Sequence, residues 1–188
     1  MNRLVEEHLE RWLGPVREVF ASDEHGRPLQ VPIGAVHDAP FEGAITLVTM
    51  GLSDYVLKQP EKSPIRQELI FAFWSRFGFR NAPALLDHFA SLAISRQRAF
   101  LRGEWDSYDA PIVDGTAMTA LIIEPPLGYM KGLLQLTGAY PEPVVVVSII
   151  PLTQEEAEFR DAHGWPDLED RLEDAAVDLL DLERASTV

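Results

Sequence analysis

The residues that most suggest catalytic chemistry are Gly51-Leu-Ser53, which directly follow an apolar segment. A serine at the end of a strand resembles the start of a nucleophile elbow, the tight turn that exposes a catalytic hydroxyl. That turn requires a second glycine two residues after the serine, where this chain has Tyr55. It also requires a helix, whereas residues 56–64 contain two prolines and three charges and are predicted to form a loop. We therefore interpret Ser53 and Asp54 as turn-forming residues.

A small serine hydrolase is the alternative interpretation of the same residues. In it Ser53 is the nucleophile, and a histidine such as His37 or His163 is the base. This hypothesis requires the Ser53 hydroxyl to lie within hydrogen-bond reach of an imidazole.

Arg66 and Glu68 are the charged residues of a strand predicted at residues 65–74. The alternation of this strand places both on one face, with Leu69 and Phe71 on the other. A half-buried glutamate needs a partner, and Arg66 is one candidate. A general acid or base would show the same pattern. A structural ion pair or a hydrogen-bonded carboxylate is the more common reason for it.

Metal and phosphate sites have no support in the sequence. The five histidines show no metal-binding spacing, and the chain contains no cysteine. No glycine-rich loop of the phosphate-binding kinds occurs, and residues 128–132, with Lys131, are interpreted as a turn. We therefore expect neither a metal nor a cofactor.

Trp105 and Tyr108 stand in a predicted acidic loop at residues 104–115. Aromatic residues of this kind anchor many protein interfaces, so both are candidate interaction residues. They fit equally well folded back onto the core, and the sequence leaves the two possibilities open. The loop's aspartates fit a binding surface as well as they fit catalysis.

The charge of the chain is strongly acidic and unevenly distributed. The formal net charge is −14, and residues 151–188 alone contain 12 acidic residues against 3 arginines. A nucleic-acid-binding protein needs a basic surface, so this class is not expected. The acidic excess fits a basic protein partner or a solvated helix surface. No apolar run approaches the roughly 20 residues that cross a bilayer, and the first residues lack the apolar core of a signal peptide, which favours a cytoplasmic protein.

The fold is centred on residues 144–150, a run of valines and isoleucines with one serine. Such a run is typical of a strand covered on both faces, and we take Pro143 and Pro151 as its limits. Thr153 and Glu156 then have the spacing of a capping box, which predicts a helix that ends at Gly164.

The remaining periodicities predict a single α+β domain over residues 1–188, in which helices flank a mixed or antiparallel central sheet. Its core extends to about residue 183, and residues 185–188 form a loose tail. Asn81 is expected to cap one of the helices. Further helices are predicted at 2–13, 81–101 and 167–184, and strands at 29–33 on an edge, at 44–50 paired antiparallel with 65–74, at 118–123 and at 133–137.

Four stretches in order resemble the suppressor of fused family. They are residues 46–54 (TLVTMGLSD), 66–73 (RQELIFAF), 119–126 (TALIIEPP) and 144–159 (VVVVSIIPLTQEEAEF). The resemblance extends over about residues 1–183 and is to the compact bacterial members with one domain, because the extra C-terminal region of the animal protein is missing.

The resemblance implies a non-enzymatic protein-binding domain without catalytic residues or cofactor. The animal relative is a cytoplasmic inhibitor that holds a transcription factor, and bacterial relatives are similar to immunity proteins that neutralise toxins. The family's recurring positions that match here are Gly51, Ser53, Glu68 and Pro151, which serve either folding or partner binding. We therefore expect a protein partner, for example a basic toxin domain, and keep a regulatory homodimer as a further alternative.

Overall fold

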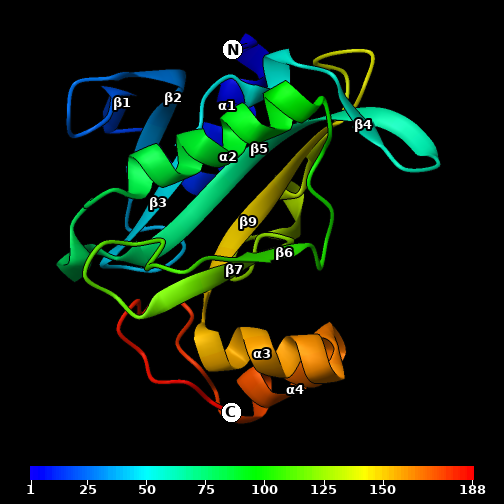
Figure 1. The fold of residues 1–188 in the computed structure, drawn as a ribbon. Coiled ribbons are helices and arrows are strands. Elements are labelled where there is room, and N and C mark those ends of the chain that lie inside the picture. The colour runs from blue at the N-terminus through cyan, green and yellow to red at the C-terminus, as the bar shows by residue number, and fades with distance from the viewer.

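One mixed β-sheet of nine strands organises the protein (Figure 1). The computed structural model describes residues 1–188. The strands are β1 (Glu18–Ser22), β2 (Pro28–His37), β3 (Ala44–Thr49), β4 (Leu57–Gln59), β5 (Lys62–Trp74), β6 (Trp105–Ser107), β7 (Met118–Glu124), β8 (Gln135–Leu136) and β9 (Val144–Thr153). Their order is β1-β2-β3-β5-β9-β7-β6, with β4 paired to β5 and β8 to β9. Only the β5–β9 pair is parallel, so the predicted α+β fold with a mixed sheet is confirmed.

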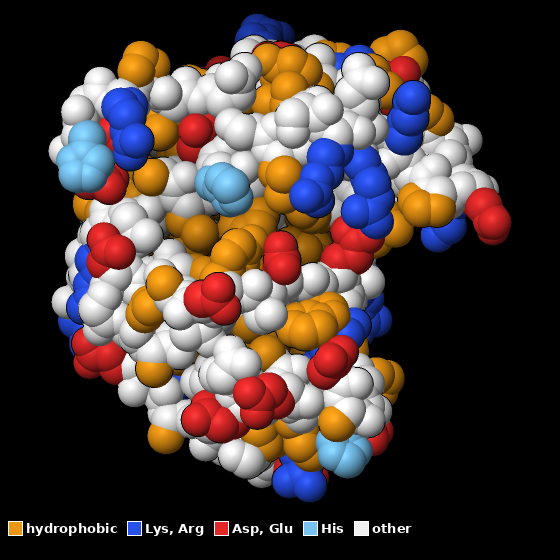
Figure 2. Space-filling view, in the orientation of Figure 1, with side chains coloured by type: hydrophobic (Ala, Val, Ile, Leu, Met, Phe, Trp, Pro, Cys, Tyr) orange, Lys and Arg blue, Asp and Glu red, His pale blue; other side chains and the backbone are white.

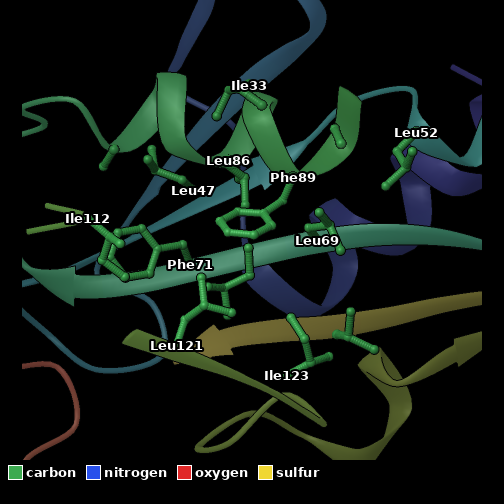
Figure 3. Close-up of a cluster of buried hydrophobic side chains, with 14 of the residues drawn as sticks. Ile33, Leu47, Leu52, Leu69, Phe71, Leu86, Phe89, Ile112, Leu121 and Ile123 are labelled. Atoms are coloured by element: carbon green, nitrogen blue, oxygen red, sulfur yellow. The ribbon is translucent and has the colours of Figure 1, made fainter. Parts of the chain in front are cut away.

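Four helices cover the sheet: α1 (Arg3–Leu13), α2 (Ala82–Arg96), α3 (Gln154–His163) and α4 (Trp165–Asp174). Helix α2 packs on one face, where Phe71, Phe89 and Leu121 belong to the largest buried cluster (Figure 3). Helix α1 packs on the opposite face over β9, and α3 with α4 covers the far ends of β7 and β9. None of the helices combines the length and the apolar character that a bilayer-spanning segment requires.

Strand β9 is the buried strand that the valine-rich run predicted. Eight of its residues from Val146 to Thr153 are buried, and Thr153 with Glu156 forms the predicted capping box at the start of α3. The expected limit at Pro151 is wrong, because this residue lies inside β9. Pairing with β5 stops at Ser148, so beyond it β9 has β7 as its neighbour on one side only, and a residue without an N–H is accommodated there.

Several other predictions about strands are also wrong. Strand β2 is not an edge strand, because β1 pairs with it. Residues 56–64, predicted as a loop, form β4 and the start of β5, and residues 104–115 include β6. Within the segment predicted as a strand at 133–137, only Gln135–Leu136 is β-structure. The short strands β4, β6 and β8 lack the apolar alternation on which the prediction relied.

Two helices end earlier than the periodicity predicts. Helix α2 ends at Arg96, because Gln97 adopts a left-handed conformation and its N–H bonds to carbonyls of the last turn. Asn81 does not cap α2 with its side chain; instead its amide donates to the Ile112 carbonyl at 3.0 Å. Helix α4 ends at Asp174, and residues 175–184 return across the end of the sheet.

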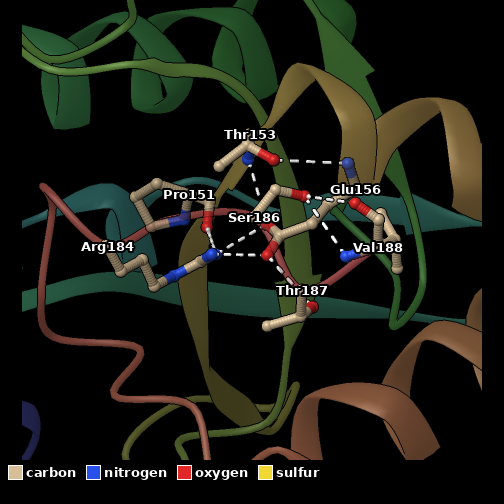
Figure 4. Close-up of polar contacts among 7 residues, drawn as sticks. All are labelled: Pro151, Thr153, Glu156, Arg184, Ser186, Thr187 and Val188. Atoms are coloured by element: carbon tan, nitrogen blue, oxygen red, sulfur yellow. Dashed lines mark hydrogen bonds and ion pairs between the residues drawn. The ribbon is translucent and has the colours of Figure 1, made fainter.

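A buried ion pair between Glu156 and Arg184 holds this returning segment. Figure 4 shows the Arg184 guanidinium directed at the Glu156 carboxylate and at the Pro151 carbonyl. The relevant distances are 2.5 Å and 2.8 Å to the carboxylate and 3.1 Å to the carbonyl, and both side chains are almost fully buried. Because Glu156 also completes the capping box, one carboxylate links the helix start to the C-terminal segment.

We expect Arg184→Ala to destabilise the protein by about 3 kcal/mol, because it leaves the Glu156 carboxylate buried without its cation. Urea unfolding followed by circular dichroism measures this loss. The double variant Arg184→Ala/Glu156→Gln should recover part of the stability. Arg3→Ala, which removes an arginine on the exposed side of α1, is the control and should change stability by less than about 0.5 kcal/mol. An Arg184→Ala protein as stable as this control would contradict the role of the ion pair.

Candidate functional site

The turn after β3 is built around the buried carboxylate of Glu68. Its Oε1 accepts the N–H of Gly51 at 3.2 Å and the N–H of Ser53 at 3.1 Å, and its Oε2 accepts the hydroxyl of Thr49. Thr49 in turn accepts the backbone N–H of Leu69 at 2.8 Å. Three of the positions that carried the family resemblance, Gly51, Ser53 and Glu68, therefore belong to one hydrogen-bond network.

Arg66 holds the outer side of the same turn and does not pair with Glu68. One guanidinium nitrogen donates to the carbonyls of Ser53 and Asp54, each at 2.9 Å, and Nε donates to Glu142 at 2.9 Å. The guanidinium also lies 4.0 Å from the centre of the Tyr140 ring. Of the two structural alternatives, the ion pair with Arg66 does not form, and Glu68 is a hydrogen-bonded carboxylate.

Ser53 cannot act as the nucleophile in this geometry. Its side chain is fully buried, and its hydroxyl oxygen has no hydrogen-bond partner, so no imidazole lies within reach. His37 instead contacts Glu18 at 2.9 Å, and His163 packs on Phe159. The structure therefore contradicts the serine hydrolase alternative.

The chemistry of Glu68 is that of a buried acid. Burial raises its pKa to about 7, and the hydrogen bonds from Ser53, Thr49 and Gly51 oppose this rise. An elevated carboxylate pKa is frequent in catalytic sites, but Glu68 lines none of the five main cavities and its side chain is fully buried. Its role is thus to hold the turn.

Trp105 and Tyr108 fold back onto the protein. Trp105 packs against the buried cluster beneath α3 and α4, with the Arg160 guanidinium 4.9 Å from its ring centre. Tyr108 packs against the main core and donates its hydroxyl proton to Asp106 at 3.2 Å. Neither ring is among the exposed large hydrophobic residues, and both are half-buried against the protein.

An apolar surface that sequence reasoning missed lies where three distant segments meet. We name it the Leu127 surface and define it as Phe41, Leu127, Val177, Leu179 and Leu180, which line one hollow of about 230 Å³. Leu127 also lines two adjoining hollows, and it is 47% exposed, while Phe41 is 53% exposed. Exposed apolar areas of this kind mark interaction sites on soluble proteins.

The charged residues that line the three hollows are all acidic: Glu169, Glu173 and Asp178. Glu169 pairs with Arg102 and Asp178 accepts the indole N–H of Trp74, whereas Glu173 has no partner. Figure 2 shows further acidic side chains over the part of the molecule formed by α3 and α4. The Leu127 surface therefore has an apolar centre and an acidic border.

Among the candidate residues from the sequence, Pro151 alone reaches this surface, where it lines one of the smaller hollows. The sequence did contain one signal for it, since Leu127 is an apolar residue directly after Pro125-Pro126 in a predicted loop. Its apolar neighbours come from the β2–β3 loop and the C-terminal segment, and no spacing rule connects these three regions.

The raised pKa of Glu68 predicts a specific pH dependence of stability. Because the folded-state pKa lies above the unfolded value, the folded state holds an extra proton between about pH 4.5 and pH 7, and this contribution is lost as the pH rises. We expect the free energy of unfolding of the parent, relative to that of Glu68→Gln, to fall by about 2 kcal/mol from pH 5 to pH 8. Urea unfolding at both values measures it. Glu10→Gln on the exposed side of α1 is the control, and a Glu68→Gln protein with the same pH dependence as the parent would contradict the assignment.

Comparisons with known proteins place this fold. The family model described as "Suppressor of fused protein (SUFU)" matches residues 27–185. A SUFU homologue from Neisseria gonorrhoeae is similar in structure, with a TM-score of 0.71 and 22% identity over 100% of this chain and 96% of that chain. A search of curated proteins finds no match.

Two further solved structures share the fold. The crystal structure of the Sufu–Fu complex has a TM-score of 0.65 with 13% identity, over 94% of this chain and 84% of that chain. Drosophila Suppressor of Fused has a TM-score of 0.56 with 12% identity, and the match covers 80% of this chain but 40% of the longer protein. Because the family model matches most of this chain, the chain belongs to the suppressor of fused family.

Proposed function

We propose that this protein is a binding domain that inhibits a basic partner protein, and that the partner docks on the Leu127 surface. The observation that carries the proposal is the apolar centre of this surface, whose charged lining residues are all acidic. An apolar side chain of the partner would fill the hollow between Phe41 and Leu127, and lysines or arginines would face Glu173 and its neighbours. The Sufu–Fu complex supports a protein-binding role, because in it a protein with the same fold is bound to another protein.

The partner that we propose is a toxin of the basic, nuclease-like kind, and the protein is its cytoplasmic immunity protein. A net charge of −14 attracts a basic domain at long range and accelerates the encounter. A toxin domain that acts on nucleic acid carries the opposite charge. An inhibitor must bind faster than its toxin acts, and electrostatic steering provides that speed.

Self-association is a weaker fit for the same surface. In a symmetric dimer the patch would face its own copy, which brings two acidic borders together. Like charges at a rim oppose association, whereas a basic partner removes this repulsion.

Protection of cells is the direct test of the inhibitor role. Bacteria that produce a basic toxin domain encoded beside this gene should survive when this protein is co-expressed, and they should die without it. Purified toxin and protein should form a complex whose association slows as salt is raised. Death of cells with every adjacent toxin would end the immunity proposal, and absence of any complex in vitro would end the binding proposal as well.

The location of the interface has its own matched test. Leu127 and Leu4 are exposed to similar extents, at 47% and 43%, but Leu4 lies on α1. We expect Leu127→Glu to raise the Kd for the toxin at least about tenfold, because a charge would enter the apolar centre. Leu4→Glu adds the same charge elsewhere and should leave the Kd unchanged. Equal effects of the two variants would exclude the Leu127 surface, and a dimer in light scattering that Leu127→Glu dissociates would assign it to self-association instead.

A further inference from the structure

A second cavity of the protein lies away from the Leu127 surface. It has a volume of about 370 Å³ and opens between the C-terminal half of α2 and the strands β6 and β7. Its apolar floor consists of Phe89 and Leu92 from α2, Phe100, and Leu121 and Ile123 from β7. Figure 2 shows this hollow below the α2 ridge, with hydrophobic side chains at its base and charged side chains of both signs around it. The volume is in the range of sites for small organic molecules.

The acidic groups at this cavity are already satisfied by the protein. The Glu104 carboxylate binds Arg98 and accepts the N–H of Leu101 at 3.1 Å. The Asp106 carboxylate accepts the N–H of Ser107 at 3.0 Å and the hydroxyl of Tyr108 at 3.2 Å. Both carboxylates are therefore occupied by neighbouring donors.

The basic groups at the same cavity retain free donors. Arg96 lines the cavity as an exposed residue, and its guanidinium makes no hydrogen bond or ion pair with the rest of the protein. Arg160 donates one nitrogen to the Gly103 carbonyl at 3.2 Å and stacks on Trp105, but its Nε is buried without an acceptor. The Nη1 nitrogen of Arg160 also makes no hydrogen bond within the protein, and unlike Nε it is not fully buried, so it is a donor that a ligand can reach. What the cavity lacks is thus an acceptor, and two guanidinium groups favour a negatively charged one.

We propose that this cavity binds a small amphipathic carboxylic acid. Its apolar body would lie on Leu92, Leu121 and Ile123, and its carboxylate would accept hydrogen bonds from the guanidinium groups of Arg96 and Arg160. This role is independent of the Leu127 surface, since the two sites share no lining residue. Burial of the apolar body supplies most of the affinity, and the arginines select the charge.

Octanoate and octanamide form a matched pair of probes, because they share an apolar chain and differ in the charged group. Titration of the full-length protein, followed by two-dimensional amide NMR, should shift the signals of residues 103–106 and 121–123 with octanoate. Octanamide should bind about tenfold more weakly. A short peptide that ends in leucine with a free carboxylate, compared with its amide, shows whether a chain terminus uses the same site, and binding of either acid supports the proposal.

Substitutions in the rim and in the floor separate charge from shape. Arg96→Gln and Arg160→Gln should each raise the Kd for octanoate about tenfold and bring it near that of octanamide. Leu92→Trp, which narrows the cavity and leaves every arginine in place, should weaken both probes. Arg3→Gln on α1 removes the same charge elsewhere and is the control. Thermal unfolding of each variant verifies the fold.

Three results would overturn the proposal. They are equal affinity for octanoate and octanamide, an octanoate affinity in Arg96→Gln and Arg160→Gln equal to that of Arg3→Gln, and the absence of shifts at residues 103–106 and 121–123 at millimolar probe.

Discussion

The parallel pairing of β5 with β9 is the constraint on which the rest of the structure depends. It joins Arg66–Ile70 to Val144–Ser148 and is the contact through which two antiparallel groups, β1-β2-β3-β5 and β9-β7-β6, become one sheet. A parallel pair needs a long connection, and here residues 75–143 supply it with α2, β6 and β7. Both faces of β9 are therefore covered, by the cluster beneath α2 on one side and by α1 with α3 and α4 on the other, which explains its continuous run of valine and isoleucine.

Glu68 lies within this parallel pair, opposite Val146. A carboxylate in so apolar a place is tolerated because Thr49, Gly51 and Ser53 direct their donors at it. The same bonds hold the exit of β3 against β5, with Arg66 closing the turn from outside. The most chemically suggestive residues of the sequence thus hold this turn together, whereas the two proposed binding sites lie elsewhere.

What could be predicted from the sequence depended on how far apart along the chain the interacting residues are. The strands β3, β5 and β9 and the Thr153–Glu156 cap are encoded by neighbouring residues, so pattern and spacing were sufficient. Glu156 and Arg184 are 28 positions apart, so no local pattern predicts their ion pair. The local periodicity instead favoured a helix that continues to residue 184, whereas α4 ends at Asp174. The Leu127 surface combines three separate loops, and only the folded chain brings them together.

The two proposed sites differ in the sign of the charge that remains unpaired. Around the Leu127 surface Glu173 has no cation, whereas at the cavity beside β6 Arg96 has no anion. In a chain of net charge −14 an anionic ligand is repelled at long range, so it would bind only where local donors and apolar burial exceed that repulsion. The same field attracts a basic protein, but the arginines at the cavity would repel its positive charges there. The charge distribution would therefore direct the two proposed ligands, a basic protein and a small acid, to different places, although β7 forms the floor of one site and leads directly into the Leu127 loop of the other.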